Sequence, residues 1–482
     1  MKLNELLKGL TVLAATADMD TDITDVCYDS RQTAEGGLFV AIAGAETDGH
    51  RFIPMAREKG AACVVCQHAP DGDIPYVVVE DSRRALAVIA CNWFDHPSRE
   101  MTMIGVTGTS GKTTSTYLIK SILEQKAGAK VGLIGTIQNM IGSEVLHTER
   151  TTPESFELQK LFRRMSDAGC THVVMEVSSH ALALDRVYGV FYQVGIFTNL
   201  TQDHLDFHKT MENYCDAKAI LFRNCVTGVV NADDPWTPRL LKDADCKVMT
   251  YAEQADADLR AENIVLSAGG IAFDAVSGAE RVPIRVNIPG GFMVYNTLDV
   301  LGAALALGIS LEESAVVLAK VPHVKGRVEI VPTPGKDYTI LIDYAHTPDS
   351  MVNVLQTVKE FAKGRTVAVF GCGGDRDRTK RPLMGKAAAD WSDFAVVTTD
   401  NPRTEEPEAI IADILPGFDG SATPYHVVVD RIEAIHWAMD HAETDDVIVL
   451  CGKGHETYQE VNHVKHHMDE REIVADYLSS GR

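Results

Sequence analysis

The chain has 482 residues, of which 45% are hydrophobic and 23% are charged, as in an ordinary globular protein. Its formal net charge of −23 argues against a surface that binds nucleic acid or an anionic membrane, because such a field repels polyphosphates. The length is too great for one hydrophobic core, and the usual domain size predicts about three domains.

The cysteines and the N-terminus indicate where the protein works. Of the ten cysteines only Cys63 and Cys66 form a C-x-x-C, inside the apolar stretch "AACVVCQ", and no second pair completes a zinc site. We interpret them as core residues of a strand and expect a reducing, cytoplasmic location. The first ten residues carry leucines at helical spacing, which predicts an amphipathic helix and not a signal peptide. No apolar run approaches the ~18 residues that cross a bilayer, so we expect no membrane insertion.

Residues 1–98 mix short strands with helices and form the first predicted domain. The stretches "GLFVAIAG" (37–44) and "AACVVCQ" (61–67) are typical of strands. The stretch "DSRRALAVIACNWF" (81–94) is typical of a helix that Asp81 or Ser82 caps. The polar, proline-containing "DHPSRE" then marks the first boundary.

Residues 99–330 repeat a pattern of strand, glycine turn and helix, which predicts a parallel sheet with helical crossovers. A second boundary falls near "VPHVKGR" (321–327). Residues 331–482 then form a third domain, in which four apolar runs each break into polar residues and glycine. These runs are "YTILIDYAH" (338–346), "RTVAVFGCGGDRD" (365–377), "DFAVVTTDNPR" (393–403) and "DDVIVLCGKGHE" (445–456). Polar residues after each strand are typical of a doubly wound sheet that binds its ligand there.

The stretch "VTGTSGKTTST" (106–116) follows a predicted strand and opens a predicted helix. Gly108 and Gly111 let the backbone turn N–H groups toward an anion, Lys112 supplies a charge for the outer phosphates, and Thr113 or Thr114 can reach Mg²⁺. Val106 replaces the first glycine of the strict P-loop, so the match is to a shorter G-x-x-G-K-T-T. The alternative is an ordinary capped helix start, and the strand–loop–helix context favours nucleotide binding.

Other strand ends and one helix carry further candidate groups. Glu176 ends a predicted strand and can hold Mg²⁺ directly or through water. His204 lies in "DHLDFH", whose spacing and lack of thiolates argue against a zinc site. Lys218 lies among apolar residues in "NYCDAKAILF". By pattern alone it is a surface lysine that extends its charge into water, although a desolvated lysine there would become nucleophilic.

The segment "VVTTDNPRTEEPEA" (396–409) places one arginine between a strand and three acids. Pro402 biases Asn401 away from helical geometry, so Arg403 would lie at the carboxyl end of a strand, where open α/β sheets bind ligands. The pattern equally fits a helix entry, with Glu405, Glu406 and Glu408 near the positive end of the helix.

A series of motifs along the whole chain resembles the Mur ligases. They are "YDSR", "DGHRFI", "GTSGKTT", "MEVSSHAL", "TNLTQDHLDFH", "YCDAKAILF", "KGRVE", "DYAHTPDS", "GCGGDRDRTKRPLMG", "DNPR" and "GKGHETYQ". The resemblance implies a three-domain α/β protein: an N-terminal UDP-substrate domain, a central P-loop parallel-sheet ATPase domain and a C-terminal Rossmann-like domain. It also implies an ATP-dependent ligase that extends a UDP-muramoyl peptide in peptidoglycan precursor synthesis, through an acyl phosphate.

The resemblance assigns roles to residues in each domain. For ATP these are Gly108, Thr109, Ser110, Gly111, Lys112, Thr113, Thr114, Asn296, Arg327 and Asp343. For Mg²⁺ and catalysis they are Thr113, Glu176, His204, Lys112 and Lys218, the last as a carbamate derived from carbon dioxide. For the UDP-muramoyl dipeptide they are Ser30, Thr151, Thr152, Ser178 and Arg186. Leu184 and Met293 depart from the family pattern, which puts one substrate contact and one contact near the adenine in doubt.

Family members with D-N-P-R take meso-diaminopimelate, and lysine-adding members lack this arginine. The resemblance places Arg381, Asp400, Asn401, Pro402, Arg403, Gly452 and Glu456 in this acceptor pocket, with Arg403 on the far carboxylate and Glu456 on the far ammonium. The partners expected are therefore small molecules, with no nucleic acid, and the protein is expected to be monomeric.

Three alternatives are weighed against this function. The first is the same ligase accepting L-lysine or another diamino acid. The second is a P-loop regulatory ATPase, which leaves "DNPR", Lys218 and "GKGHE" without a role. The third is a folate polyglutamate-forming relative, which the N-terminal "YDSR" and "DGH" motifs disfavour.

Overall fold

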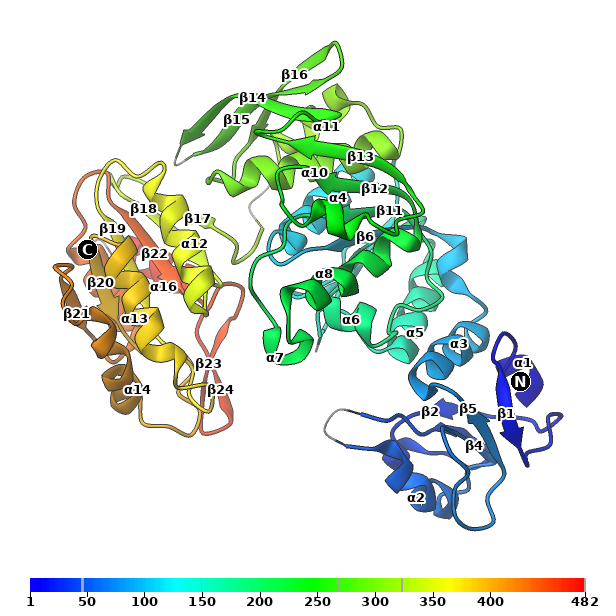
Figure 1. The fold of residues 1–482 in the computed structure, drawn as a ribbon. Coiled ribbons are helices and arrows are strands. Elements are labelled where there is room, and N and C mark those ends of the chain that lie inside the picture. Colours follow the sequence, from blue (N-terminus) through cyan, green and yellow to red (C-terminus); the bar gives the residue numbers. More distant parts are fainter. Residues whose placement is uncertain (45–46, 149, 268, 322–323, 481–482) are drawn as a thin grey trace. The chain divides into compact units, whose positions relative to one another are not determined.

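The computed structural model describes residues 1–44, 47–148, 150–267, 269–321 and 324–480. The chain forms two compact units (Figure 1). The first unit contains Met1–Asp258 and Asp299–Ser310, and the second contains Leu259–Leu298 and Leu311–Arg482. The predicted connection "VPHVKGR" is only partly visible, because residues 322–323 lie outside the described residues.

The first unit begins with a five-stranded sheet in the order β1-β5-β4-β3-β2. Its strands are β1 (Val12–Ala15), β2 (Val26–Cys27), β3 (Leu38–Val40), β4 (Cys63–Cys66) and β5 (Tyr76–Val79). Both predicted strands are present, and Cys63 and Cys66 are buried in β4, as expected of core residues. Asp81, not Ser82, caps α3 (Ser82–Trp93) by accepting from the backbone N–H groups of Arg83 and Arg84.

The N-terminal helix is shorter than predicted. Only α1 (Leu3–Leu6) is helical, because Gly9 adopts a left-handed φ of 89° and the chain turns into β1. Leu3, Leu6 and Leu7 are nevertheless buried, so the periodicity identified the side that faces the core.

The rest of the first unit contains the predicted parallel sheet, with strands in the order β13-β12-β11-β6-β10-β7-β8-β9. The bounds are β6 (Thr102–Thr107), β7 (Val131–Ile134), β8 (Asn139–Ile141), β9 (Glu144–Leu146), β10 (His172–Glu176), β11 (Tyr192–Phe197), β12 (Cys225–Asn231) and β13 (Lys247–Ala252). Strand β8 pairs antiparallel with both β7 and β9. The helices are α4 (Lys112–Lys126), α5 (Ser155–Asp167), α6 (Ser179–Ala183), α7 (Leu205–His208), α8 (Met211–Ala219) and α9 (Thr237–Leu240).

Strand β6 lies between β10 and β11 in this sheet. Glu176, the last residue of β10, is therefore in register with Val106, directly before the glycine loop. The carboxyl ends of these neighbouring parallel strands meet at one edge, as the sequence pattern required.

The second unit contains an antiparallel ribbon and the C-terminal sheet. The ribbon comprises β14 (Leu259–Ser267), β15 (Gly270–Ser277) and β16 (Glu280–Val286). The helix α10 (Phe292–Ala306) contributes residues to both units, and α11 (Leu311–Leu318) belongs to the second.

The C-terminal sheet has the order β17-β18-β22-β19-β20-β21 and is parallel except for β17. The strands are β17 (Glu329–Val331), β18 (Thr339–Asp343), β19 (Thr366–Phe370), β20 (Phe394–Val397), β21 (Tyr425–Val427) and β22 (Val447–Cys451). The four apolar runs singled out in the sequence became the adjacent strands β18, β22, β19 and β20. The predicted boundary at residue 330 falls inside β17, so this sheet begins slightly earlier than expected.

Helices cover both faces of this sheet (Figure 1). One core joins it to α12 (Pro348–Lys359), α13 (Lys380–Trp391) and α14 (Pro407–Ile414), and the other joins it to α15 (Arg431–Asp440) and α16 (Glu470–Ser479). Successive residues alternate between the two cores: Ile340 and Ile342 point to one face and Leu341 to the other. A hairpin of β23 (Tyr458–Val461) and β24 (Val464–His467) follows the last strand.

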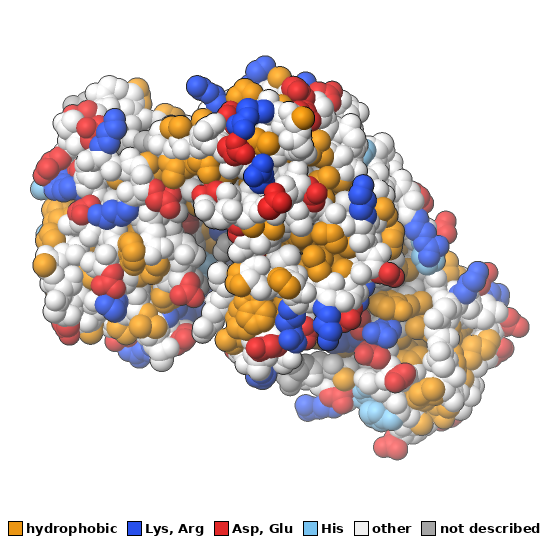
Figure 2. Space-filling model, turned by 45° about the horizontal axis from the view of Figure 1, so that its top comes forward, with side chains coloured by type: hydrophobic (Ala, Val, Ile, Leu, Met, Phe, Trp, Pro, Cys, Tyr) orange, Lys and Arg blue, Asp and Glu red, His pale blue; other side chains and the backbone are white. Residues whose placement is uncertain are grey.

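No helix among the described residues has the length and apolar character that a membrane-spanning segment needs. On the face that Figure 2 displays, acidic and basic side chains are intermingled, with no broad basic patch.

Candidate functional site

The glycine loop lies between β6 and α4, as predicted. Gly108 has a φ of 153°, and a Cβ at this position would come within 1.8 Å of the Thr198 hydroxyl, so only glycine fits. The Nζ of Lys112 folds over the loop and donates to the carbonyl oxygens of Gly108 at 3.0 Å and Thr109 at 2.8 Å. Backbone N–H groups at the start of α4 therefore remain directed at the space where an anion would bind.

The other predicted loop residues are held from neighbouring segments. The Thr109 hydroxyl lies 3.1 Å from the Tyr214 hydroxyl, and the Ser110 N–H donates to the Asn199 amide oxygen at 3.0 Å. Gly111 has a φ of 88° and precedes the first turn of α4, in which Thr114 is buried. The loop is thus fixed in shape before any ligand arrives.

Glu176 is buried beside the loop and organises several hydroxyl groups. One carboxylate oxygen accepts from the Thr113 hydroxyl at 2.9 Å and from the Thr136 backbone N–H at 2.9 Å. The other accepts from the Thr136 hydroxyl at 3.0 Å. Thr136, two residues after β7, was missed in the sequence, because a threonine after a short strand carries no distinctive pattern.

Lys218 is 1% exposed, so it is not the surface lysine that the local pattern favoured. Its Nζ donates to the carbonyl oxygen of Gly108 at 2.7 Å and lies 4.5 Å from the centre of the Tyr214 ring. Burial, and then the nearby charge of Lys112, hold the pKa of Lys218 well below its usual value. The structure thereby brings together Lys112 and Lys218 at one carbonyl group.

His204 lies close enough to Lys112 and Lys218 for their charges to act on it. It directly precedes α7 and has a left-handed φ of 53°. Its ring lies 3.3 Å from the carboxylate of Asp203, and burial lowers its pKa. Within the described ranges no cluster of three or more His, Cys, Asp or Glu residues could hold a metal ion. The donors present are the Glu176 carboxylate and the Thr113 hydroxyl, oxygen ligands that suit Mg²⁺ completed by phosphates and water.

Four of the five residues predicted to bind the UDP substrate lie together. The Thr152 hydroxyl donates to the Glu176 carbonyl at 2.8 Å and accepts from the Ser178 N–H at 3.1 Å. Arg186 donates to the Thr152 carbonyl at 3.3 Å, and the Thr151 hydroxyl lies 3.0 Å from that of Thr136. The fifth residue, Ser30, lies in the N-terminal part of the unit, where its hydroxyl contacts the Met55 sulfur at 3.3 Å.

The other residues predicted for the nucleotide belong to the second unit or its helix α10. Asn296 is buried on α10, one turn from Met293. Asp343 ends β18 and accepts from the backbone N–H groups of Val328 and Ala345, while burial raises its pKa. The Arg327 guanidinium lies over the Tyr344 ring at 5.5 Å, on the same side of the C-terminal sheet.

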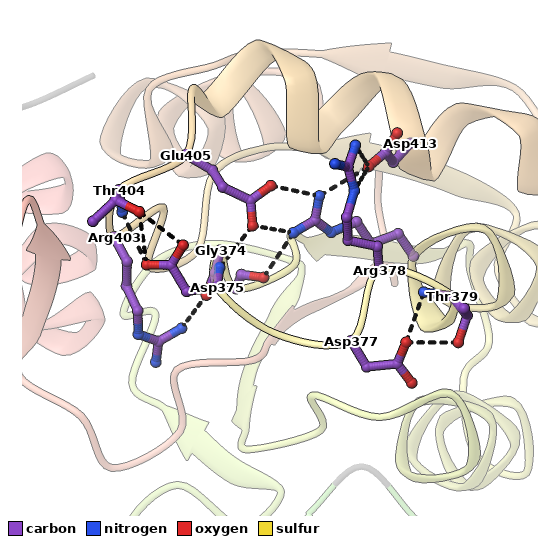
Figure 3. Close-up of polar contacts among 11 residues, drawn as sticks. Gly374, Asp375, Asp377, Arg378, Thr379, Arg403, Thr404, Glu405 and Asp413 are labelled. Carbon is purple, nitrogen blue, oxygen red and sulfur yellow. Dashed lines mark hydrogen bonds and ion pairs between the residues drawn. The ribbon is translucent and has the colours of Figure 1, made fainter.

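Arg403 follows β20, as predicted, and has a left-handed φ of 52°. Its backbone pairs with the β23 hairpin, because its N–H donates to the Glu460 carbonyl at 3.0 Å and its carbonyl accepts from the Asn462 N–H at 2.7 Å. The guanidinium donates to the Gly374 carbonyl at 2.7 Å (Figure 3). It also lies 3.3 Å from the Glu460 carboxylate. The position of Arg403 after a strand and the acidic start of a helix are both present, since Glu408 lies in the first turn of α14.

Asp400 and Gly452 meet between the ends of β20 and β22. One Asp400 carboxylate oxygen accepts from the Asn401 N–H at 2.7 Å, and the other is buried with no hydrogen-bond partner among the described residues. Gly452 has a φ of 109°, and a Cβ there would lie 2.6 Å from that second oxygen. The glycine therefore leaves room beside an unpaired buried acceptor.

Asn401 and Glu456 form one cluster with Lys453, a residue of the G-K-G-H-E motif for which the sequence predicts no role. The Lys453 Nζ donates to the Asn401 amide oxygen and to the Glu456 carboxylate, both at 2.8 Å. The Asn401 amide nitrogen donates to the same Glu456 oxygen at 3.0 Å, and the amide oxygen also accepts from the Glu460 N–H at 2.8 Å. Lys453 is fully buried.

Arg381 does not present a free side chain in this pocket. It is fully buried on α13, where its guanidinium contacts the carboxylates of Glu405, at 2.7 and 2.9 Å, and Asp413, at 2.9 Å. Figure 3 shows Glu405 and Asp413 on one side of the loop and Arg403 on the other, directed at Gly374. Arg381 therefore fixes the segment that follows Arg403 and does not face the ligand space.

Models of the Mur ligase family match the chain in three places. The Mur ligase family catalytic domain matches residues 22–93, the Mur ligase middle domain matches residues 106–304, and the Mur ligase glutamate ligase domain matches residues 326–454. The chain belongs to the Mur ligase family, which confirms the predicted family, the ligase class and the three-domain α/β architecture.

Similar proteins span the whole chain. Proteins from Clostridium acetobutylicum and Bacillus cereus, 49% and 42% identical, each align with 99% of this chain and 99% of their own length. Both are named UDP-N-acetylmuramoyl-L-alanyl-D-glutamate–2,6-diaminopimelate ligase. A solved structure of a ligase with that name is 31% identical, with a TM-score of 0.74 over 100% of this chain and 99% of its own. A Thermotoga maritima ligase in complex with ADP, 18% identical with a TM-score of 0.60 over 95% and 97% of the two chains, shares the fold.

Proposed function

We propose that this chain is an ATP-dependent ligase that joins meso-diaminopimelate to UDP-N-acetylmuramoyl-L-alanyl-D-glutamate. The observation that carries the acceptor assignment is that side chains of both charges occur in the loops after β20 and β22. Arg403 offers a guanidinium, while Asp400 and Glu456 offer carboxylate oxygens within the same set of loops. An acceptor with an extra carboxylate and an extra ammonium matches this set, and the names of the relatives support the same substrates.

The acceptor pocket that we propose contains Asp400, Asn401, Pro402, Arg403, Gly452 and Glu456. Arg376 takes the place first assigned to Arg381. It is exposed, and a Cβ built on Gly373 would lie 3.0 Å from the Arg403 Nη1 and 3.7 Å from the Arg376 Cγ, so the two arginines border the same glycine. Two guanidinium groups can bind a carboxylate more specifically than one ammonium group, because each offers paired donors.

The nucleotide loop that we propose acts by positioning and by electrostatics. Loop N–H groups and Lys112 hold the phosphates of ATP, while the substrate carboxylate attacks the γ-phosphorus to give an acyl phosphate and ADP. The amine of the acceptor then attacks the acyl carbon, and phosphate leaves from the tetrahedral intermediate. Thr113 and Glu176, with His204 nearby, would hold Mg²⁺, which offsets the charge that develops on the phosphoryl oxygens.

Lys218 is proposed to be carbamylated. A lowered pKa leaves its amine neutral more readily, and a neutral amine attacks carbon dioxide, forming an N–C bond and releasing one proton. The resulting anion would supply a further oxygen ligand for Mg²⁺.

The UDP-muramoyl dipeptide is proposed to be held by Thr151, Thr152, Ser178 and Arg186, with Ser30. The nucleotide is proposed to be held by Asn296, Arg327 and Asp343. We place the protein in the cytoplasm as a monomer, where ATP is available.

The test is an assay of amide formation with purified protein, ATP, Mg²⁺, UDP-N-acetylmuramoyl-L-alanyl-D-glutamate and either meso-diaminopimelate or L-lysine. We expect product only with diaminopimelate, and phosphate release only when both the peptide and the acceptor are present. Equal turnover with lysine refutes the acceptor assignment, and phosphate release with neither substrate favours a regulatory ATPase.

Arg403→Ala should raise the KM for diaminopimelate at least about tenfold, because a charged hydrogen-bond donor to the far carboxylate is lost. The KM for ATP should stay unchanged. Arg378→Ala is the matched control, since this exposed arginine pairs with Asp413 in the same region. Comparable rises in both KM values would refute the proposed role of Arg403.

A further inference from the structure

Lys453 is a fully buried cation at the carboxyl end of the C-terminal sheet, and neither the sequence motifs nor the proposed contacts assign it a role. It follows Gly452 in the loop after β22, and its side chain is 0% exposed. Its Nζ lies 5.2 Å from the centre of the Tyr458 ring. A buried ammonium is unfavourable unless it is paired and hydrogen-bonded, so its partners identify what it stabilises.

Those partners are both residues of the proposed acceptor pocket. Lys453 reaches Asn401, in the loop after β20, and Glu456, in its own loop, at 2.8 Å each. Asn401 in turn donates to Glu456 at 3.0 Å, which closes a triangle of three side chains. The Asn401 amide oxygen also accepts from the Glu460 N–H at 2.8 Å, which helps to fix the orientation of the amide group.

This triangle leaves Glu456 with one carboxylate oxygen committed to the protein. The contacts of Glu456 with Lys453 and with Asn401 both involve the same carboxylate oxygen, Oε2. The orientation of the carboxylate is therefore set, and its second oxygen is the one available to an acceptor. Lys453 also balances the negative charge of Glu456, which the ligand alone would otherwise have to balance.

We infer that Lys453 is a positioning residue for the acceptor: it orients Glu456 and joins the D-N-P-R loop to the G-K-G-H-E loop, without touching the substrate. The inference rests on the proposed function of the acceptor pocket. Glu456 is proposed to bind the distal ammonium of the acceptor, and Lys453 is the buried cation behind its carboxylate. Recognition of that ammonium therefore depends on Lys453 as well. Because Lys453 acts through Glu456, its removal should have no effect of its own once Glu456 is altered.

The experiment is a double-mutant cycle on the full-length protein, with Lys453→Met, Glu456→Gln and the double variant. Methionine retains most of the aliphatic stem and removes the charge. We expect Lys453→Met to raise the KM for diaminopimelate about tenfold or more, with the KM values for ATP and the UDP-muramoyl dipeptide within about twofold of the wild type. In the Glu456→Gln background the same change should raise the diaminopimelate KM by less than about threefold.

Lys465→Met is the matched control, because Lys465 is exposed and its Nζ lies 4.1 Å from the centre of the same Tyr458 ring. It should leave all KM values unchanged. Should Lys453→Met fail to fold, the double variant decides, because it carries no unpaired buried charge at this position. Its diaminopimelate KM should then lie within about threefold of that of Glu456→Gln.

Two results overturn the inference. One is an unchanged diaminopimelate KM in Lys453→Met, and the other is an equal effect of Lys453→Met in both backgrounds, which indicates a structural role independent of Glu456. Failure of the proposed function gives a different pattern: Glu456→Gln and Arg403→Ala would then leave the diaminopimelate KM unchanged as well.

Discussion

Two fully buried lysines, one beside the nucleotide loop and one behind the acceptor pocket, have similar surroundings but different partners. Lys218 is 1% exposed and lies 4.5 Å from the centre of the Tyr214 ring, while Lys453 is 0% exposed and lies 5.2 Å from that of Tyr458. Lys218 donates to a backbone carbonyl group, that of Gly108, whereas Lys453 donates to a carboxylate, that of Glu456. Burial alone therefore does not determine the chemistry of a lysine, and its partner does.

The difference has a simple electrostatic basis. The carbonyl group of Gly108 carries no net charge, so it holds a proton on the lysine less strongly than a carboxylate does. Burial and the charge of Lys112 thus lower the pKa of Lys218, and its amine becomes available as a nucleophile. Lys453 has a carboxylate at 2.8 Å, so its charge serves to orient that group.

The largest expected effect comes from Lys218, because the carbamate that we propose there would contribute to the chemistry and not only to orientation. Lys218→Met should lower kcat by about 10²–10³, the loss typical of removing one group that stabilises developing charge. Wild-type protein incubated with ¹³C-bicarbonate should show a carbamate carbon signal by NMR. That signal should be absent in Lys218→Met and present in Lys453→Met, which separates the two lysines directly.

Lys120→Met is the control for loss of a buried lysine in the same unit, since Lys120 is 7% exposed and pairs with Glu124 on α4. It should affect stability while kcat changes by less than about threefold. A carbamate signal that persists in Lys218→Met, or an unchanged kcat, would refute the proposed role of Lys218.

Gly452→Ala tests the acceptor side without removing a charge. The added Cβ would lie 2.6 Å from the unpaired carboxylate oxygen of Asp400, and the left-handed φ of 109° would be strained. We expect the diaminopimelate KM to rise about tenfold, through displacement of that carboxylate, with a loss of about 1–2 kcal/mol in the free energy of unfolding. Steady-state kinetics and urea unfolding measure the two effects.

Gly420→Ala separates strain from displacement. Gly420 also has a left-handed φ, of 77°, but a Cβ there would meet nothing within 4 Å. It should lower stability by about the same 1–2 kcal/mol and leave the diaminopimelate KM unchanged. Equal KM effects in the two variants would show that Asp400 has no part in binding.

The two regions also differ in how well the sequence alone predicts them. The glycine loop is contiguous, so Gly108 to Thr114 and the flanking strand and helix could be recognised from spacing. The proposed acceptor pocket joins loops that follow three strands, β19, β20 and β22, and the contact between Lys453 and Asn401 spans 52 positions. No local pattern reports such a contact, and the same holds for Thr136 beside Glu176.

The burial of Arg381, for which we propose Arg376 instead, shows where more could have been predicted. Arg381 shares one face of α13 with the buried residues Met384, Gly385 and Ala388, at spacings of three, four and seven residues. This periodicity indicates an inward-facing side chain, whereas Arg376 lies in the preceding polar loop. The lowered pKa of Lys218, by contrast, comes from burial and from the charge of Lys112, and its hydrogen-bond acceptor lies 110 positions away, which periodicity cannot indicate.

The smallest expected effect extends the comparison to a buried arginine, Arg381, which contacts two carboxylates. Its guanidinium holds the pKa of Glu405 at about 2, below the usual 4.5. A carboxylate with a lowered pKa stabilises the folded state above pH 4.5, and this contribution is lost as the pH falls toward 2. Because Glu405 is partly exposed, solvent screening limits the contribution to about 1 kcal/mol.

Glu405→Gln should therefore lower the free energy of unfolding by about 1 kcal/mol at pH 7, and the difference from wild type should vanish as the pH approaches 2. Urea midpoints at a series of pH values, followed by tryptophan fluorescence, measure the difference. Glu408→Gln is the matched control, because this exposed acid lies three residues away at the start of α14 and should change the midpoint less than half as much. If the difference in urea midpoint between Glu405→Gln and wild type does not change with pH, the contact of Glu405 with Arg381 contributes packing and not charge. Arg381 would then differ from both lysines, whose proposed roles depend on their charge state.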